Sequence, residues 1–152
     1  MSSWLLDQGA DPNAECDIAY TPLSHAIRTA SLEIIHLLLR RGGDVQKGQL
    51  MHQAIYRESN NLEVAQLLID SGAPFDYLLY EDHVPSQSKF PFMIETPLHT
   101  AVTFRRPEIV TLLLQQGASI ETRNSQGKTV MDYADVSTRE IIMHAVENSQ
   151  SS

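Results

Sequence analysis

The amino-acid sequence predicts an all-α domain of stacked helix-turn-helix units. The same order of residue types recurs along the chain: a helix-start motif, a short helix with a small alanine, a polar break, and a longer apolar run that ends in glycine. Within the longer runs, apolar residues recur at spacings of three and four, as on one side of a helix. The length of 152 residues, with 42% hydrophobic and 20% charged residues, is that of a single globular domain.

The first helix of each predicted unit is short and starts at a defined residue. Thr21 and Thr96 each precede a proline, so each supplies an N-cap while the proline fixes φ at the first helical position. Because other units replace this threonine or the histidine that follows it, we expect uneven capping. A small alanine in each helix lets the next helix approach closely. These residues are Ala26, Ala54, Ala101 and Ala134.

The second helix of each predicted unit carries apolar residues over more than half of its circumference, so it must be buried on several sides. These helices are expected at 32–39, 62–69, 107–114 and 140–146. Glycines stand where a residue in the left-handed region would end a helix and turn the chain into a loop. They are Gly9, Gly42, Gly72 and Gly117.

Residues 96–101 carry the clearest copy of the repeated motif. They read Thr-Pro-Leu-His-Thr-Ala, and Thr129 begins the next copy after one period of about 33 residues. This pattern resembles the ankyrin repeat, a unit of that length made of a β-turn and two helices. The resemblance implies an ankyrin-repeat-like solenoid of stacked helix-turn-helix units with β-turn fingers. It also implies that His99 forms hydrogen bonds within its turn.

We expect one domain whose boundaries follow the repeat. It comprises a partial repeat and finger at 1–20, repeats at 21–48, 49–75 and 96–128, an inserted loop at 76–95, and a capping repeat with a polar tail at 129–152. The unit that begins at Thr21 is about five residues shorter than the repeat. Its finger, at 44–48, is therefore expected to be stunted.

The predicted insertion at 76–95 is long and apolar. It contains two tyrosines, two phenylalanines and a methionine, a composition too apolar for a spacer. Insertions in repeat arrays fall in loops on one face, which is often the binding face. The insertion either packs back over the neighbouring repeats, by ordinary hydrophobic burial, or uses its aromatic residues to anchor a partner.

The charge balance narrows the classes of partner. Nineteen acidic and eleven basic residues give a net charge of -8, which disfavours phosphate backbones and anionic membranes. We therefore expect no nucleic acid and no membrane among the partners, and neither a signal peptide nor a membrane span. The single cysteine, Cys16, permits no intrachain disulfide and fits a reducing compartment. The expected localisation is intracellular, cytoplasmic or nuclear.

No motif for catalysis, a metal or a cofactor stands out in the sequence. None of the six histidines forms the His-x-x-x-His pair with a nearby acid that a helical zinc site uses. Gly127, Lys128 and Thr129 resemble the end of a phosphate-binding loop, but Thr122 stands where that loop needs a glycine. We expect no metal, no cofactor and no enzymatic activity.

The resemblance implies that a partner protein is held by the finger tips and by exposed positions after the small alanine of each first helix. Carried over position by position, the predicted partner-binding residues are Asp17, Ile18, Tyr20, Arg28, Thr29, Tyr56, Arg57, Thr103, Phe104, Ser125, Gln126 and Lys128. Arginine and aromatic side chains are typical of interaction hot spots. Because Arg28, Arg57 and Arg105 oppose the net negative charge, an acidic segment of the partner would complement them.

The function implied by the resemblance is that of an intracellular protein–protein interaction module, acting as a scaffold, an adaptor or a regulatory subunit. A second hypothesis is a small-molecule binder or small enzyme that uses the 76–95 insertion as a lid. Its candidate polar groups are Tyr80, Glu81, Asp82 and His83.

The two ends of the predicted stack differ. Residues 4–11 resemble the second half of a repeat, without a first helix before them to cover Trp4, Leu5 and Leu6. Terminal repeats of such stacks normally carry a polar cap. We therefore expect this edge to be covered by further repeats of a larger parent chain, by another protein, or by self-association with a second copy. The C-terminal edge, which runs into a polar tail, is expected to be finished.

Overall fold

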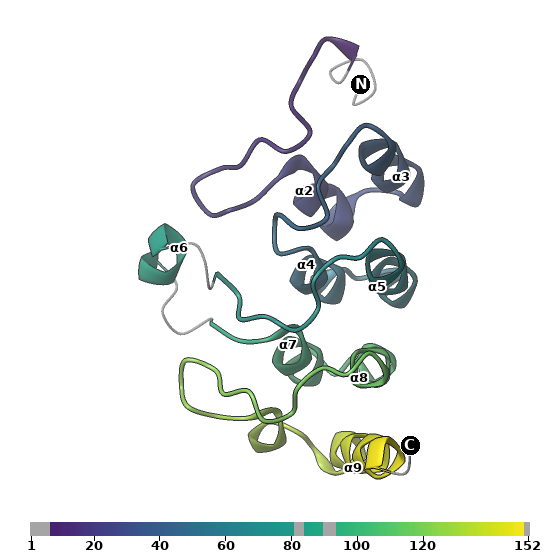
Figure 1. The fold of residues 1–152 in the computed structure, drawn as a ribbon, viewed down its shortest axis with the longest axis vertical. Coiled ribbons are helices and arrows are strands. Elements are labelled where there is room, and N and C mark those ends of the chain that lie inside the picture. Colours follow the sequence, from purple (N-terminus) through teal and green to yellow (C-terminus); the bar gives the residue numbers. More distant parts are fainter. Residues whose placement is uncertain (1–6, 81–83, 90–93, 151–152) are drawn as a thin grey trace.

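The fold is a stack of helix pairs in two layers (Figure 1). The computed structural model describes residues 7–80, 84–89 and 94–150. The inner layer comprises α2 (Pro22–Thr29), α4 (Leu50–Tyr56), α7 (Pro97–Thr103) and the 3₁₀-helix η1 (Val130–Asp132). The outer layer comprises α3 (Leu32–Arg40), α5 (Asn61–Asp70), α8 (Pro107–Gln115) and α9 (Val136–Gln150). The all-α prediction is confirmed, since the described residues form helices and turns without a strand.

One apolar core runs along the stack between the two layers. The small alanines predicted to allow close helix approach are all buried in it: Ala26, Ala54, Ala101 and Ala134. Larger side chains with no exposed surface come from every helix pair, among them Leu23, Ile35, Met51, Leu68, Leu98, Leu113 and Ile142. Burying one such side chain contributes about 1.5–3 kcal/mol relative to leaving it exposed. Each repeat therefore depends on its neighbours for most of its stability.

The inner helices are capped unevenly, as the sequence predicts. Thr21 and Ser24 form a capping box at α2, in which Thr21 Oγ1 accepts from the Ser24 N–H at 3.2 Å and Ser24 Oγ accepts from the Thr21 N–H at 3.0 Å. Thr96 caps α7 by accepting from the His99 N–H. Gln49, which replaces the threonine at α4, makes no side-chain cap and has a left-handed φ of 56°. Helix α4 is therefore held mainly by its packing.

Helices α2, α4 and α7 are each tied to the start of the next repeat by one side-chain hydrogen bond. The three donors and their carbonyl acceptors are Ser24 Oγ to Gly48 at 2.7 Å, His52 Nε2 to Glu95 at 3.1 Å, and His99 Nε2 to Lys128 at 3.0 Å. Each carbonyl belongs to the residue directly before the next unit. Because a carbonyl oxygen only accepts, both histidines carry a proton on Nε2. We name these three hydrogen bonds the inter-repeat ties.

His99 confirms the hydrogen-bonding role predicted for it. Its Nδ1 accepts from Thr96 Oγ1 at 2.8 Å within the turn, while its Nε2 forms the tie. His52 occupies the same position in its own repeat, which lacks the threonine. Its Nδ1 accepts instead from the Tyr77 hydroxyl at 3.1 Å, and the two rings meet edge-on with centroids 5.2 Å apart.

The residues at the base of the insertion are packed against the rest of the chain. Leu79 and Tyr80 are 2% and 8% exposed, and the Leu79 N–H donates to the Glu95 carbonyl at 2.9 Å, which closes the loop at its base. The loop also contains α6 (Val84–Lys89), which lies on the same side of the inner helices as the fingers (Figure 1). Leu79 and Tyr80 thus follow the first of the two alternatives, whereas Asp76 and Ser88 are exposed. Residues 90–93, with both phenylalanines and the methionine, lie outside the described part.

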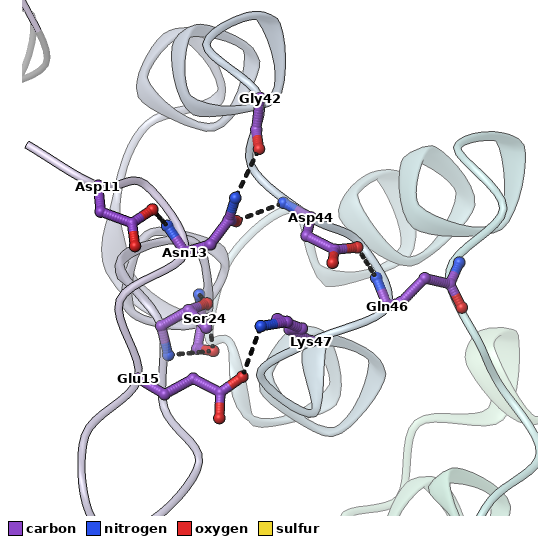
Figure 2. A network of polar contacts seen from close by, with 9 residues as sticks. Asp11, Asn13, Glu15, Ser24, Gly42, Asp44, Gln46 and Lys47 are labelled. Carbon is purple, nitrogen blue, oxygen red and sulfur yellow. Dashed lines mark hydrogen bonds and ion pairs between the residues drawn. The ribbon is translucent and has the colours of Figure 1, made fainter. Parts of the chain in front are cut away.

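The loops between repeats are linked by hydrogen bonds between side chains and backbone (Figure 2). The Asn13 amide donates to the Gly42 carbonyl at 2.8 Å and accepts from the Asp44 N–H at 2.7 Å. One repeat later, the Gln46 amide donates to the Gly72 carbonyl at 2.8 Å. These bonds hold the short finger against both of its neighbours.

Gly48 and Gly42 form a matched pair for testing this packing. Both have left-handed φ values, +84° and +87°, so alanine strains the backbone at either position by about 1–2 kcal/mol. At Gly48 the added Cβ would also lie 2.1 Å from Ser24 Oγ, which forms both the cap and the tie. We expect Gly48→Ala to lower the free energy of unfolding, measured by urea denaturation, by at least about 2 kcal/mol more than Gly42→Ala. Equal losses would contradict the packing described.

The pH dependence of stability tests the burial of His52. Burial lowers the pKa of His52 from 6.5 to about 3, and the neighbouring His99 adds to this shift. The unfolded chain therefore binds more protons between these values, so stability falls as the pH drops below 6.5. We expect a loss of up to about 1.4 kcal/mol per pH unit from this residue, seen by urea unfolding at several pH values. His52→Gln should remove it, whereas His144→Gln, at an exposed position, should leave it in place.

Candidate functional site

The candidate partner surface comprises the first and last fingers and the inner helices of the stack. Figure 1 shows the first finger, before α2, and the last finger, before η1, on the same side of the inner layer as α6. The predicted residues belong to these two fingers and to the C-terminal ends of α2, α4 and α7. The stacking of the repeats therefore distributes them along one side of the protein.

Three side chains from successive inner helices form a continuous row, which we name the Arg–Tyr–Phe row. Arg28, near the end of α2, places its guanidinium carbon 5.3 Å from the centroid of the Tyr56 ring. Tyr56, the last residue of α4, meets the Phe104 ring edge-on with centroids 5.0 Å apart. Phe104 follows α7 and is 47% exposed, and Arg28 is exposed as well. The row thus presents a cation and an aromatic surface to solvent.

Tyr20 extends the row toward the first finger. Its hydroxyl accepts from Arg28 Nη1 at 3.4 Å and donates to the side-chain carbonyl of Gln53. Because Gln53 belongs to α4, these contacts hold the first finger against the following repeat. The structure therefore brings together four of the predicted residues: Tyr20, Arg28, Tyr56 and Phe104.

The row combines neutral aromatic rings with one cation. Burial raises the pKa of Tyr56 to about 12, and the nearby Glu95 carboxylate adds to the shift. Tyr56, like an ordinary tyrosine, is neutral at pH 7, and the raised pKa keeps it so in alkaline solution as well. The Glu95 carboxylate accepts a hydrogen bond from Thr100 Oγ1 at 2.8 Å, so it is already engaged within the stack.

The last finger holds a second group of predicted residues. Asn124 closes its turn, because the side-chain oxygen accepts from the N–H groups of Gln126 and Lys128, each at 3.0 Å. The Lys128 ammonium lies 5.6 Å from the centroid of the Tyr133 ring, and the Tyr133 hydroxyl donates to the Gln126 side chain at 3.2 Å. Ser125, Gln126 and Lys128 are exposed. Asn124 and Tyr133 are not among the predicted residues, although asparagine is a recognised turn residue.

The remaining predicted residues lie beside these two groups. Asp17, Thr29 and Thr103 are exposed, and Ile18 is half-buried. The Thr29 hydroxyl donates to the His25 carbonyl at 2.9 Å, within its own helix. Their part in binding stays a prediction.

Arg57 does not belong to the exposed surface on which it was predicted to lie. Its side chain is 7% exposed and donates to the backbone carbonyls of Ile27, Ala30 and Ser59 at 2.9, 2.7 and 2.6 Å. The last carbonyls of a helix lack partners within it, and the Arg57 guanidinium supplies donors for the end of α2. The expectation that Arg57 lies exposed is therefore wrong. Arg106 acts similarly one repeat later, where its Nη2 donates to the Arg57 carbonyl at 3.2 Å.

Two further expectations fall outside the described residues. Glu81, Asp82 and His83 of the lid hypothesis belong to the segment 81–83, and the uncovered N-terminal edge belongs to the segment 1–6. Tyr80, the fourth candidate polar group, is buried, and this burial raises its pKa. Within the described ranges, no cluster of histidine, cysteine and acidic side chains could hold a metal ion. None of the helices described there has the length and apolar character needed to cross a membrane.

Comparison with known protein families tests whether the repeats belong to an established family. The family profile for ankyrin repeats (three copies) matches residues 1–77, and the profile for ankyrin repeats (many copies) matches residues 93–134. The chain belongs to the ankyrin repeat family. The resemblance carried by residues 96–101 is thereby confirmed. Ankyrin repeats are protein–protein interaction modules, and the family is not a family of enzymes.

Several curated proteins are similar to this chain, and two of the three described here are called ankyrin repeat proteins. Putative ankyrin repeat protein FPV018 of Fowlpox virus (strain NVSL) is 24% identical over 180 aligned positions, 85% of this chain and 26% of that protein. BRCA1-associated RING domain protein 1 of Caenorhabditis elegans is 36% identical over 87 positions, 56% of this chain and 11% of that protein. Ankyrin repeat and SOCS box protein 11 of Mus musculus is 28% identical over 119 positions, 75% of this chain and 32% of that protein. The chain spans less than a third of the length of these relatives.

Truncation of the two arginines should separate structural from surface roles. Arg57→Ala leaves three backbone carbonyls without their donors, so we expect a loss of about 2–4 kcal/mol in the free energy of unfolding. Arg28→Ala removes an exposed contact with a ring and should cost less than about 1 kcal/mol. Urea denaturation of both variants beside the wild type measures the difference. Similar losses for both would contradict the assignment of Arg57 to the interior.

Proposed function

We propose that this ankyrin repeat chain binds a partner protein through the Arg–Tyr–Phe row and the two fingers that flank it. The observation that supports the proposal most directly is the row itself. It aligns an exposed guanidinium, a half-buried tyrosine and a half-exposed phenylalanine across three successive repeats. Arginine and aromatic anchors that are partly buried before binding lose little conformational freedom when a partner covers them.

We propose further that the bound segment of the partner is acidic. Arg28 belongs to the row, and Arg105 lies in the turn after α7, next to Phe104 in the chain; both are exposed, and neither forms an ion pair with another residue of the described part. Both oppose the chain's net charge of -8. Each exposed pair with a partner carboxylate is worth up to about 1 kcal/mol, so the two arginines would mainly set specificity and association rate. Burial of the rings would supply most of the affinity.

The role that fits this surface is that of a scaffold, adaptor or regulatory subunit. In each of these roles the chain acts by binding another protein. The two aromatic rings would supply affinity and the arginine would supply specificity.

Affinity capture from cell extract tests the proposal. The double variant Arg28→Glu, Phe104→Ala removes the cation and the most exposed ring of the row. We expect it to lose a protein that the wild type captures, with at least about a tenfold weaker affinity for the purified partner. Raising the salt concentration should weaken capture by the wild type, because the arginines steer an acidic segment.

Arg40→Glu is the matched control for this experiment. Arg40 is exposed at the end of α3, in the outer layer, and receives the same reversal of charge. Circular dichroism should show that every variant remains helical. Capture of the same proteins by the wild type and both variants would remove the row from the binding surface.

A further inference from the structure

A groove lies between α8 and α9, in the outer layer and at the C-terminal end of the stack. Figure 1 shows these two helices as neighbours, away from the fingers. The groove has a volume of about 770 Å³ and is continuous with a hollow of about 400 Å³, since Leu114 and Ala145 line both. We name the two together the α8/α9 groove.

The floor of the α8/α9 groove is apolar. Leu114 from α8 and Ile141 and Ala145 from α9 line it, and all three are half-buried, so part of their surface meets solvent. The α9 residues that line the groove lie three and four positions apart, from Ser137 to Asn148, and therefore share one face of the helix. That face extends for about 17 Å, or three turns.

The rim of the α8/α9 groove is acidic. Glu140 lines the larger hollow and Glu121 the smaller one, and both carboxylates are exposed. Neither forms an ion pair with another described residue. Among the residues that line the two hollows, none is lysine or arginine. The sign of this charge is opposite to that of Arg28 on the proposed partner surface.

We infer that the α8/α9 groove binds an amphipathic helix of a partner protein, one with an apolar stripe and basic flanks. A trough between two helices accepts the apolar stripe of a third, with i, i+3, i+4 and i+7 residues as anchors. The small side chain of Ala145 lets the backbone of such a helix approach closely. Lysine or arginine beside the stripe would meet Glu140 and Glu121, which otherwise have no cation.

Defined peptides test this inference directly. The probe is a helical peptide of about 18 residues, or five turns, with a leucine stripe and lysine flanks. One comparison peptide keeps the stripe and carries glutamate flanks, and another scrambles the order of the basic peptide. We expect fluorescence anisotropy to show at least tenfold tighter binding of the basic helix than of either comparison peptide. Amide NMR shifts should concentrate at Leu114, Ile141 and Ala145.

Two variants probe the floor and the rim separately. Ala145→Arg fills the floor and should weaken binding of the basic peptide at least tenfold. Glu140→Lys reverses the charge of the rim and should weaken that peptide about fivefold, while tightening the acidic one. Glu58→Lys carries the same charge reversal at an exposed loop position outside the groove, and should change the affinity less than twofold. Circular dichroism checks the fold of each variant.

The inference is overturned if the acidic and scrambled peptides bind as tightly as the basic one, or if Glu58→Lys weakens binding as much as Glu140→Lys. A second copy of the chain is the other occupant that the same experiment can reveal. A dimer in sedimentation velocity that Ala145→Arg converts to monomer would assign the groove to self-association and would also overturn the inference. Because Arg28 and Phe104 lie outside the groove, their replacement should leave peptide binding unchanged whatever becomes of the proposed function.

Discussion

The inter-repeat ties are the interaction on which the rest of the structure depends. Each joins a side chain in the first turn of an inner helix to the carbonyl that immediately precedes the next repeat. They fix how far one inner helix lies from the next, because a buried hydrogen bond tolerates little change in length. This spacing allows Tyr56 to contact Arg28 on one side and Phe104 on the other. The proposed partner surface is thus a consequence of the same bonds that build the stack.

The sequence predicts the parts of this protein that repeat, and misses those that depend on one particular contact. The turn role of His99 follows from a motif of six residues, and the burial of Ala26 or Ala54 follows from its place in the period. The exposure predicted for Arg57 is wrong, because its guanidinium donates to the last carbonyls of α2 in the preceding repeat, a contact that the repeated motif does not encode. The α8/α9 groove could not be predicted, since its floor exists only where two helices distant in sequence leave apolar side chains partly uncovered.

The two proposed surfaces differ in charge and in layer. The Arg–Tyr–Phe row belongs to the inner helices and presents arginine, whereas the α8/α9 groove belongs to the outer helices and presents glutamate. A partner suited to one surface is repelled by the other, so the two sites would not compete for a single ligand. A chain with both could hold two proteins at once, and the rigid core between the layers would set the distance between them.

The inserted loop is closed at its base by hydrogen bonds, and this closure limits the effect that a change in loop length has on the repeats. The Glu95 carbonyl accepts from both the Leu79 N–H and His52 Nε2, so the two ends of the loop are fixed by the tie itself. For a loop with pinned ends, each doubling of the number of residues costs only about 0.6 kcal/mol of closure entropy. A change in the number of residues between positions 80 and 94 would therefore have little effect on the stability of the repeats.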